Sequence, residues 1–392
     1  MSIEVDNAYK ITERLAFPRL VGSEGESKAL AIVIDEFQKA GYISPKQDKF
    51  KTCFYNWNFT RYIFLVLGSI LILMALSFYI NPLITIGIFI VGLVIGYRIL
   101  VISTSARIKL SKHEEYNYET QNVFTELKSK NSKASIIFMA HWDSKSQTFP
   151  TSTRILIFLV FLLGSLLIFI TYLILAIVYL TFRWNLPILN NILLDFCLIL
   201  ATIGGLNYFN KTGNKSPGAF DNAAAVGVIL ELARYYKLNP SEYIDFTFLS
   251  TGSEELNLGG AGVFIEKYKN NFDKNSTFFI NLDFVGGVEL IRLTSSYGIP
   301  RKTSSPKLIK LILESAEELG IKIKEIYAPT GIWSDLMPVV QEGFEACWIG
   351  SEPGLKYVHT AKDTMDLVSI QGIKMILDLC VDIVKKLEKE LN

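Results

Sequence analysis

Residues 216–222 read Ser-Pro-Gly-Ala-Phe-Asp-Asn, a tight turn that delivers an acid to the start of a predicted helix over 222–237. Proline and glycine together favour the turn. The acid, Asp221, has two explanations that the stretch alone leaves open. It could cap free N–H groups at the helix start, or it could bind metal. We expect Asp221 to bridge two metal ions, because other metal-ligand residue types follow predicted strands elsewhere in the chain.

Three short apolar runs of the buried-strand type are each followed by such residues. Strands that alternate with helices predict an open, largely parallel sheet. Ligands of such sheets bind beyond the carboxyl ends of the strands, so we expect these side chains to converge on one edge. They are His141 after the strand 135–140, Glu254 and Glu255 after 243–249, and Asp283 after 277–282.

The residue types suit a zinc site. Imidazoles and carboxylates without thiolates are typical of open zinc sites that keep a water molecule. Asp143 lies two residues after His141, on the same face if the strand continues, and could hold the second imidazole nitrogen. Of the pair Glu254 and Glu255, one can bind metal while the other takes a proton from the attacking water. Taken singly, each could instead be a structural histidine, a solvated acid pair or a turn cap.

Composition narrows the class of protein. The chain has 392 residues, enough for one large or two ordinary domains, and half of them are hydrophobic. The net charge of +1 gives no argument for nucleic-acid binding. The four cysteines form no C-x-x-C motif, so neither a disulfide framework nor a thiolate zinc site is expected. The polar, acid-containing N-terminus predicts no cleavable signal peptide.

Two long apolar regions predict transmembrane hairpins at 59–106 and 151–210. The first is charge-free from Tyr62 to Tyr97 and is broken near its middle by Asn81-Pro82. Spanning a bilayer takes about 20 residues, and a charge at its centre costs roughly 3 kcal/mol. The alternative is a hairpin buried in the core of a soluble protein.

The second region pairs the charge-free run 155–182 with 188–209, joined by the polar and aromatic turn 183–187. Its single acid, Asp195, either lies near the headgroups or points into the helix bundle. The positive-inside rule places the catalytic domain in the cytoplasm, since only Arg183 lies in the opposite turns. The basic residues on the domain side are Arg61, Arg98, Arg107, Lys109, Arg154, Lys211 and Lys215.

Other patterns complete the prediction of an α/β protein with a mixed, mostly parallel central sheet between helices. Further helices are expected at 5–15, 27–40, 259–269, 306–319 and 369–391. Further strands are expected at 49–55, 122–127, 321–327 and 344–350.

Five motifs, taken in order, resemble the series of the co-catalytic di-zinc aminopeptidases, a group that includes bacterial secreted aminopeptidases, glutamate carboxypeptidase and the metal-free transferrin receptor ectodomain. The resemblance covers residues 1–58, 107–150 and 211–392, which would form one zinc peptidase domain. The motifs are Ala140-His141-Trp142-Asp143-Ser144, the stretch 216–222, Gly252-Ser253-Glu254-Glu255-Leu256, Asn281 to Gly286, and His359 to Thr364.

The resemblance implies two zinc ions per chain and assigns a role to each motif. Asp221 would bridge the ions, and Glu254 would be the general base that takes a proton from water and returns it to the leaving amine. A peptide substrate with a free N-terminus is implied. The remaining ligands would be His141 and Asp283 for one ion, and Glu255 and His359 for the other.

The chain departs from the family pattern in two places. A hydrophobic hairpin separates the first two motifs, and Ser334-Asp335-Leu336 stands where the family often has Ser-Asp-His. Trp333 and Leu336 would therefore lie where relatives place polar groups that contact substrate. Tyr327 is a candidate oxyanion donor.

The expected function is that of an integral membrane zinc aminopeptidase with four spans and a catalytic cleft that opens towards the membrane surface. Hydrophobic or membrane-derived peptides would then be its substrates. Two alternatives stay open: a catalytically inactive peptidase-like receptor or scaffold, and a single-zinc glutaminyl cyclase-like enzyme. Metal stoichiometry separates the three.

Overall fold

The computed structural model describes residues 2–53, 55–109, 118–184, 186–298, 300–328, 334–353 and 356–392, without the side chains of 55–60 and 97–109. His113 and Trp333 lie outside the described residues. The chain divides into two compact units. The first comprises residues 1–53, 104–146 and 213–392, and the second comprises 54–103 and 147–212. We describe each unit by itself.

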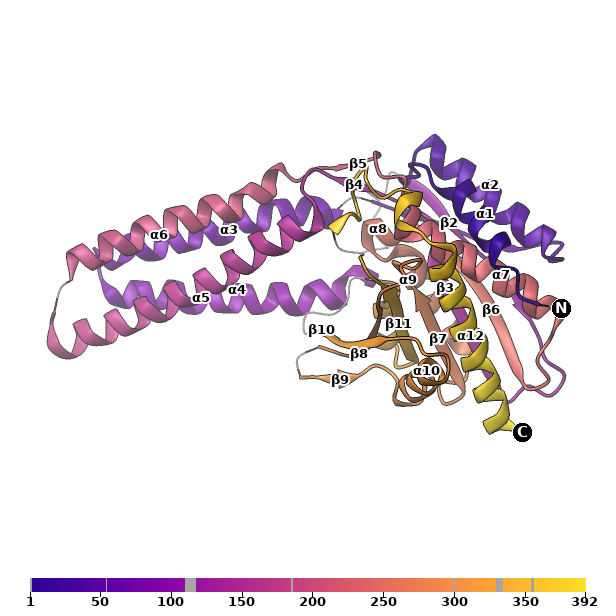
Figure 1. Cartoon of the computed structure of the whole chain (residues 1–392). Helices are drawn as coiled ribbons and strands as arrows, with labels where there is room; N and C mark the ends of the chain where they lie inside the picture. Colours follow the sequence, from indigo (N-terminus) through magenta and orange to yellow (C-terminus); the bar gives the residue numbers. More distant parts are fainter. Residues whose placement is uncertain are drawn as a thin grey trace. The chain divides into compact units, whose positions relative to one another are not determined.

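A mixed sheet forms the middle of the first unit, with strand order β1-β2-β6-β3-β7-β11-β8-β10 and β9 beside β8 (Figure 1). The four central strands, β6, β3, β7 and β11, are parallel, whereas β1, β2 and β8 pair antiparallel to their inner neighbours. The strands are β1 (Lys46–Thr52), β2 (Tyr118–Leu127), β3 (Ala134–His141), β6 (Ile244–Thr251), β7 (Thr277–Leu282), β8 (Ile291–Tyr297), β9 (Lys302–Thr303), β10 (Ile323–Ala328) and β11 (Glu345–Ser351). Two short strands, β4 (Ser146–Gln147) and β5 (Thr212–Gly213), pair separately.

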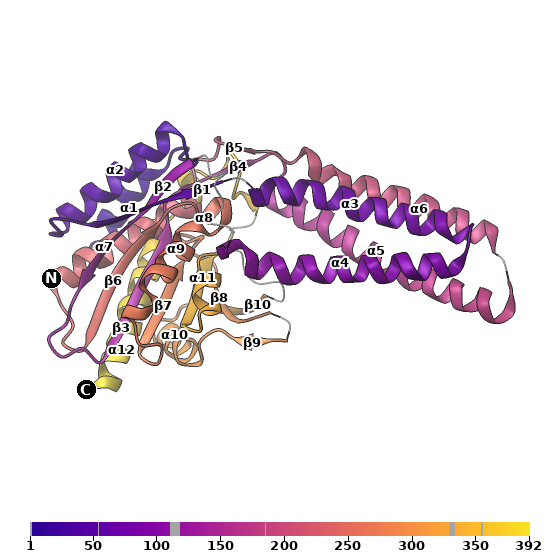
Figure 2. The same cartoon turned by 180° about the vertical axis from the view of Figure 1, so that it is seen from behind.

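Helices cover both faces of this sheet (Figures 1 and 2). Side chains alternate along β3: Ile136 and Phe138 pack into one buried cluster, and Ile137 and Met139 pack into the other. This two-residue period is that of a strand buried on both faces. The first cluster includes helices α1 (Val5–Leu15), α2 (Glu24–Lys39), α7 (Ala224–Leu238), α10 (Pro306–Glu318) and α12 (Ile370–Leu391), and the second includes α9 (Gly259–Tyr268) and α11 (Leu336–Gln341).

Local signals set the helix starts. The Ser23 hydroxyl accepts the N–H of Glu26, and the Glu26 carboxylate accepts the N–H of Gly22, so two main-chain donors at the start of α2 are satisfied. Ser305 caps α10 by accepting the N–H of Leu308, and Pro306 follows at the first helical position. These caps explain why the predicted helices begin within a few residues of the observed ones.

The second unit contains four apolar helices, α3 (Tyr55–Phe78), α4 (Pro82–Lys109, of which residues up to 103 belong to this unit), α5 (Thr151–Phe182) and α6 (Pro187–Gly205), followed by a short 3-10 turn at 206–209. Small residues let α5 and α6 approach closely. A Cβ added at Gly164 would lie 2.6 Å from Leu200, and one at Gly204 would lie 2.6 Å from Phe161. Many large apolar side chains of these helices are exposed, such as Leu167 at 65% and Ile188 at 76%.

Among the residues that the structure describes, three segments are long and apolar enough to cross a membrane: Arg61–Phe78, Thr151–Phe182 and Pro187–Phe209. In α4 the described side chains give only a shorter apolar stretch, Pro82–Gly96. Membrane association is therefore supported, and the four-span arrangement stays a prediction. Asp195 is exposed on α6 and does not point into the bundle, which removes one of its two expected placements.

The structure confirms the predicted mixed sheet between helices and differs in details. Strands β8 and β9 were not expected. The run Ile291–Tyr297 contains Arg292 and three consecutive Thr and Ser residues, so it lacks the continuous apolar character of the central strands. The helix expected from Asn222 begins at Ala224, because Asp221 and Asn222 have non-helical backbone angles.

Candidate metal centre

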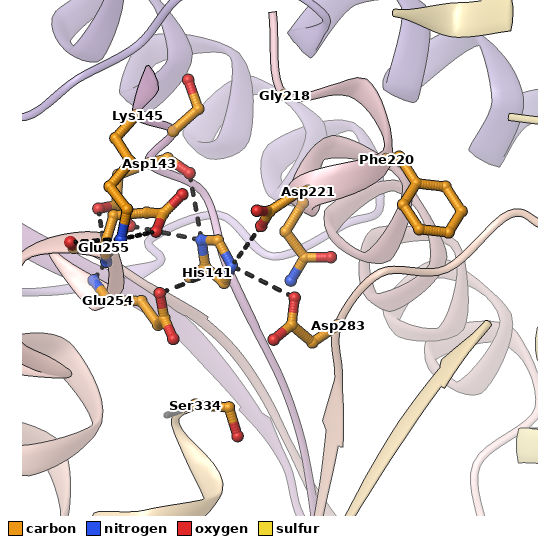
Figure 3. Close-up of polar contacts among 12 residues, drawn as sticks. His141, Asp143, Lys145, Gly218, Phe220, Asp221, Glu254, Glu255, Asp283 and Ser334 are labelled. Atoms are coloured by element: carbon orange, nitrogen blue, oxygen red, sulfur yellow. Dashed lines mark hydrogen bonds and ion pairs between the residues drawn. The ribbon is translucent and has the colours of Figure 1, made fainter. Parts of the chain in front are cut away.

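The strand ends that carry candidate ligands are neighbours in the sheet. Strand β3 lies between β6 and β7, with His141 paired to Thr251 and Met139 paired to Asn281. The chain therefore turns at the same edge three times, just before Glu254, just after His141 and just before Asp283. Figure 3 shows these side chains pointing towards one another. The structure brings the residues together as expected from a parallel sheet, while their roles stay predictions.

The first group of candidate ligands comprises His141, Asp221 and Asp283, all buried. Nε2 of His141 lies 3.2 Å from Oδ1 of Asp221 and 3.5 Å from Oδ1 of Asp283. Oδ1 of Asp283 is buried and accepts no hydrogen bond within the described part of the chain, and its other oxygen accepts the indole N–H of Trp348 over 3.2 Å. One oxygen is thus fixed by the protein, and the other faces His141 without a hydrogen bond from the described residues.

The second group comprises Asp221, Glu255 and His359. Nε2 of His359 lies 3.1 Å from Oδ2 of Asp221 and 3.1 Å from Oε2 of Glu255. Asp221 therefore belongs to both groups and offers a different oxygen to each. This is the arrangement that a carboxylate bridging two cations requires. In each group one atom per residue lies within 4.8 Å of the others.

Asp221 does not cap the helix that follows it. The first helical residues of α7 receive no side-chain cap, and Asp221 has φ −122° and ψ 84°, outside the helical region. Its main chain is held from elsewhere: the Asp363 carboxylate accepts the N–H of Phe220 over 2.7 Å and that of Asp221 over 3.2 Å. The capping explanation of Asp221 is therefore wrong, and Asp363 is a supporting residue that the sequence patterns did not single out.

The Asp143 carboxylate has a different partner from the one expected. Its two oxygens accept the N–H groups of Glu254 and Glu255, each over 3.1 Å, at the start of the short helix α8 (Glu254–Asn257). Nδ1 of His141 lies 3.1 Å from the main-chain oxygen of Asp143 but 3.6 Å from the carboxylate, which is too long for a hydrogen bond. Asp143 therefore orients the glutamate pair directly and His141 through its carbonyl.

Glu254 belongs to neither ligand group, although its Oε2 lies 3.9 Å from Nε2 of His141. Burial raises the pKa of Glu254 well above its usual 4.5; His141 opposes this, and the nearby acids Glu255, Asp283 and Asp335 add to it. A buried carboxyl next to the two groups, with a pKa raised in this way, has the properties of a general base.

Lys145 contacts the second group and was missed by the sequence reasoning. Its Nζ lies 2.6 Å from Oε2 of Glu255 and donates to the Glu255 carbonyl over 3.0 Å. Lys145 is only 5% exposed, so this ammonium is a buried charge beside a candidate ligand. Its position four residues after His141 was the available signal, because the chain leaves β3 at that point.

Ser334-Asp335-Leu336, the stretch that departs from the family pattern, places a buried acid near the two groups of candidate ligands. Asp335 is fully buried and accepts the hydroxyl of Thr251 at the end of β6. Burial raises the pKa of Asp335 to about 7, with His141 opposing the shift.

The neighbouring residue Ser334 accepts a hydrogen bond from the side-chain amide of Asn281 over 3.2 Å. Leu336 is fully buried, whereas Tyr327 of β10 is 41% exposed and donates its hydroxyl to the carbonyl of Gly298, just after β8, so that hydroxyl is already bonded.

Unusual backbone angles gather around the centre. Ser253, Phe284 and His359 all have φ between 58° and 61°, a left-handed conformation that side chains other than glycine rarely adopt. Ser253 directly precedes the glutamate pair, and Phe284 directly follows Asp283. Such strain persists where the surrounding structure fixes the backbone, and it is common at functional sites.

Residues 205–384 match the profile of Peptidase family M28. The chain carries a peptidase family M28 domain. This confirms the expected kinship with the zinc aminopeptidases. The matched residues include Asp221, Glu254, Glu255, Asp283 and His359, and the sheet geometry adds His141 and Asp143 from outside the match.

Among known proteins, the chain is similar to aminopeptidase YwaD of Bacillus subtilis, with 28% identity over 169 residues, 42% of this chain and 36% of that protein. The alignment thus spans about a third of this relative's length. Among solved structures, it is similar to the zinc aminopeptidase BSAP from Bacillus subtilis, with a TM-score of 0.53 and 14% identity over 98% of this chain and 95% of the other. A glutaminyl cyclase from an Acidobacteriales bacterium gives a TM-score of 0.56 and 14% identity over 100% and 96%. These structural similarities show a shared fold.

Proposed function

We propose that the chain is a membrane-anchored zinc metallopeptidase, an aminopeptidase that removes N-terminal residues from peptides. The observation that carries this proposal is the pair of three-residue groups that share Asp221. The fold alone is compatible with several activities. A shared carboxylate between two imidazole-containing groups is specific to chemistry that needs two cations side by side.

The residues present fit two zinc ions. His141, Asp221 and Asp283 would hold one, and Asp221, Glu255 and His359 the other. Nitrogen and carboxylate oxygen ligands without thiolates are those of open, catalytic zinc sites. When bound, the ions polarise the scissile carbonyl and make water acidic enough to be deprotonated at neutral pH. Oδ1 of Asp283 is buried and accepts no hydrogen bond from the described residues, an arrangement that is costly unless a cation pairs with it.

Glu254 is the residue that we assign to proton transfer. Its main-chain N–H is fixed by Asp143, so the carboxylate is presented to the centre from a rigid helix start. It takes a proton from the attacking water and donates it to the leaving amine. His141 and Asp283, held by the Asp143 carbonyl and by Trp348 respectively, keep the ligand geometry constant during this transfer.

Replacement of Glu254 tests this function. Glu254→Gln keeps the shape of the side chain but cannot accept the proton, so hydrolysis of aminoacyl substrates should fall by at least about a thousandfold while zinc content stays the same. Glu325→Gln, at an exposed position of β10, is the matched control. A fully metallated Glu254→Gln variant with normal turnover would refute the role.

Membrane anchoring by four spans with a cytoplasmic catalytic domain is the second part of the proposal. It is supported by the three candidate spans and by the basic residues that flank them in the sequence. Hydrophobic or membrane-derived peptides are the proposed substrates. The chain should resist alkaline extraction from membranes, and a cysteine introduced at Trp184 should react with an impermeant reagent added from outside. Equal turnover of apolar and polar peptides would contradict the substrate assignment.

A single-zinc enzyme of the glutaminyl cyclase kind is the alternative that one observation favours. Lys145 lies against Glu255, so the second group already contains one positive charge. If that ammonium excludes a second cation, zinc stoichiometry would be one per chain, and N-terminal glutamine would be cyclised rather than released. An inactive scaffold is less well supported, because all the expected ligand types are present.

A further inference from the structure

Arg19 is a buried cation whose side chain bonds only main-chain oxygens within the described part of the chain. It is fully buried and lies in the connection between α1 and α2. Its guanidinium donates to five carbonyls: Trp142 at 2.6 Å, Pro217 at 2.5 Å, Gly218 at 2.8 Å, Leu15 at 2.9 Å and Phe17 at 3.2 Å. An arginine that only anchored the N-terminal helices would need only the carbonyls of Leu15 and Phe17.

The other three carbonyls belong to the two loops that carry candidate ligands. Trp142 lies between His141 and Asp143, while Pro217 and Gly218 immediately precede the segment that ends in Asp221. One planar guanidinium therefore ties the loop after β3 to the loop before α7. These loops are separated by about seventy residues, which include two of the apolar helices.

The main chain around Arg19 repeats the same connection. The N–H of Arg19 donates to the Ser144 hydroxyl over 3.1 Å, the N–H of Ser144 donates to the Arg19 carbonyl over 3.3 Å, and the Ser144 hydroxyl donates to Ser216 over 3.2 Å. Gly218 completes the arrangement. It has φ +58°, and a Cβ there would lie 2.7 Å from Ser144 and 3.0 Å from the guanidinium. Only glycine allows this close approach.

A buried guanidinium is costly, and that cost argues for a specific role. Burial lowers the pKa of Arg19 to about 10, and the charges of Asp363, Asp221, Asp143 and Glu255 offset part of the effect. A lysine would carry the same charge but could not hold carbonyls of two loops in one plane. The residue thus supplies both a rigid fork and a positive charge beside the acids of the centre.

We propose that Arg19 is a positioning residue of the metal centre, which sets the distance between His141 and Asp221 by clamping their two loops together. The inference rests on the proposed metal centre and extends it to the N-terminal segment, outside residues 205–384. Since supporting residues that orient metal ligands typically change metal affinity by about 10–100-fold, removal of the fork should have an effect of this size.

The experiment compares Arg19→Met and Arg19→Lys with Arg14→Met in the full-length protein in detergent. Arg14 lies on α1 at 42% side-chain exposure and pairs with Asp35 and Glu36 of α2, so it is a matched control that contacts neither ligand-bearing loop. Zinc affinity is measured by competition with a chromogenic chelator. The visible spectrum is recorded for each variant saturated with Co²⁺, and thermal unfolding of the metal-free protein is followed separately.

Arg19→Met should bind zinc about 10–100-fold more weakly, and its saturated Co²⁺ spectrum should differ from that of the unsubstituted protein. Arg19→Lys should recover part of the zinc affinity but not the Co²⁺ spectrum of the unsubstituted protein. Arg14→Met should match the unsubstituted protein in zinc affinity and in Co²⁺ spectrum. A folded Arg19→Met variant with unchanged affinity and spectrum would overturn the inference.

If Arg19→Met does not fold, the Arg19→Lys variant tests the inference. An unchanged Co²⁺ spectrum in Arg19→Lys would contradict the need for a planar guanidinium at this position. Failure of the unsubstituted chain to bind zinc would refute the proposed metal centre itself, and the positioning role with it. The two failures are therefore distinguishable in the same measurement.

Discussion

The Asp143 carboxylate accepts the main-chain N–H of Glu254 over 3.1 Å, and its second oxygen accepts that of Glu255 over the same distance. One side chain at the end of β3 thus fixes the start of the helix that presents both glutamates after β6. We predict that Asp143→Asn lowers kcat by about 10–100-fold. An amide has only one acceptor oxygen, and its NH₂ group would face the other N–H.

Zinc content of Asp143→Asn should stay near that of the unsubstituted protein, because Asp143 is not in either ligand group. Asp366→Asn is the control, since Asp366 is exposed in a short 3-10 helix and accepts the hydroxyl of Thr364. Normal kcat in Asp143→Asn would mean that the glutamates are held in place without this carboxylate.

Trp348 orients one oxygen of Asp283 through its indole N–H. Trp348→Phe keeps the aromatic packing against Phe284 but removes the donor. We expect zinc affinity to fall about tenfold, within the range typical of residues that support metal ligands. Trp184→Phe, at a 64% exposed position, should leave affinity unchanged. Equal affinities for both variants in a chelator competition would show that the indole contact does not matter.

Lys145 provides a test of the two-ion arrangement. Its ammonium lies 2.6 Å from a Glu255 oxygen that the second ion would need. Lys145→Met removes this repulsion, so binding of the second zinc should tighten by at least about tenfold, because like charges this close interact strongly in a buried site. Isothermal titration resolves the two binding steps. Weaker binding of the second ion would instead make Lys145 a supporting residue.

Acid stability should depend on Asp245 at the start of β6. Burial alone would raise the pKa of Asp245, but hydrogen bonds from Ser129 and Lys128 outweigh it and hold the pKa below its usual 3.8. The lowered pKa stabilises the folded state above pH ~4, and this contribution is lost as pH falls through the folded-state pKa.

Asp245→Asn should therefore reduce the free energy of unfolding by about 1–3 kcal/mol at neutral pH. The difference from the unsubstituted protein should shrink towards acid pH. Thermal unfolding between neutral and acid pH measures this, with the surface residue Asp378→Asn as control. A difference that stays constant with pH would contradict the linkage.

Sequence patterns predicted the central strands and the edge at which the candidate ligands meet, because fully buried parallel strands are continuous apolar runs and their ends must share one edge. They could not reveal Arg19, Asp363 or Trp348, since each acts through contacts with residues over sixty positions away in the chain. They also placed Asp143 beside His141, where its carboxylate lies 3.6 Å from Nδ1. The alternation rule located its side chain on the face of His141 but could not show that the main-chain donors of Glu254 and Glu255 lie closer.

The bridging role of Asp221 is tested most directly by zinc content per chain, measured by elemental analysis of the purified protein and of two variants. We predict two zinc ions in the unsubstituted chain, one in His359→Gln and none in Asp221→Asn, because only Asp221 belongs to both groups. A single ion in the unsubstituted chain, or an Asp221→Asn variant that keeps one ion tightly bound, would contradict the shared-carboxylate centre.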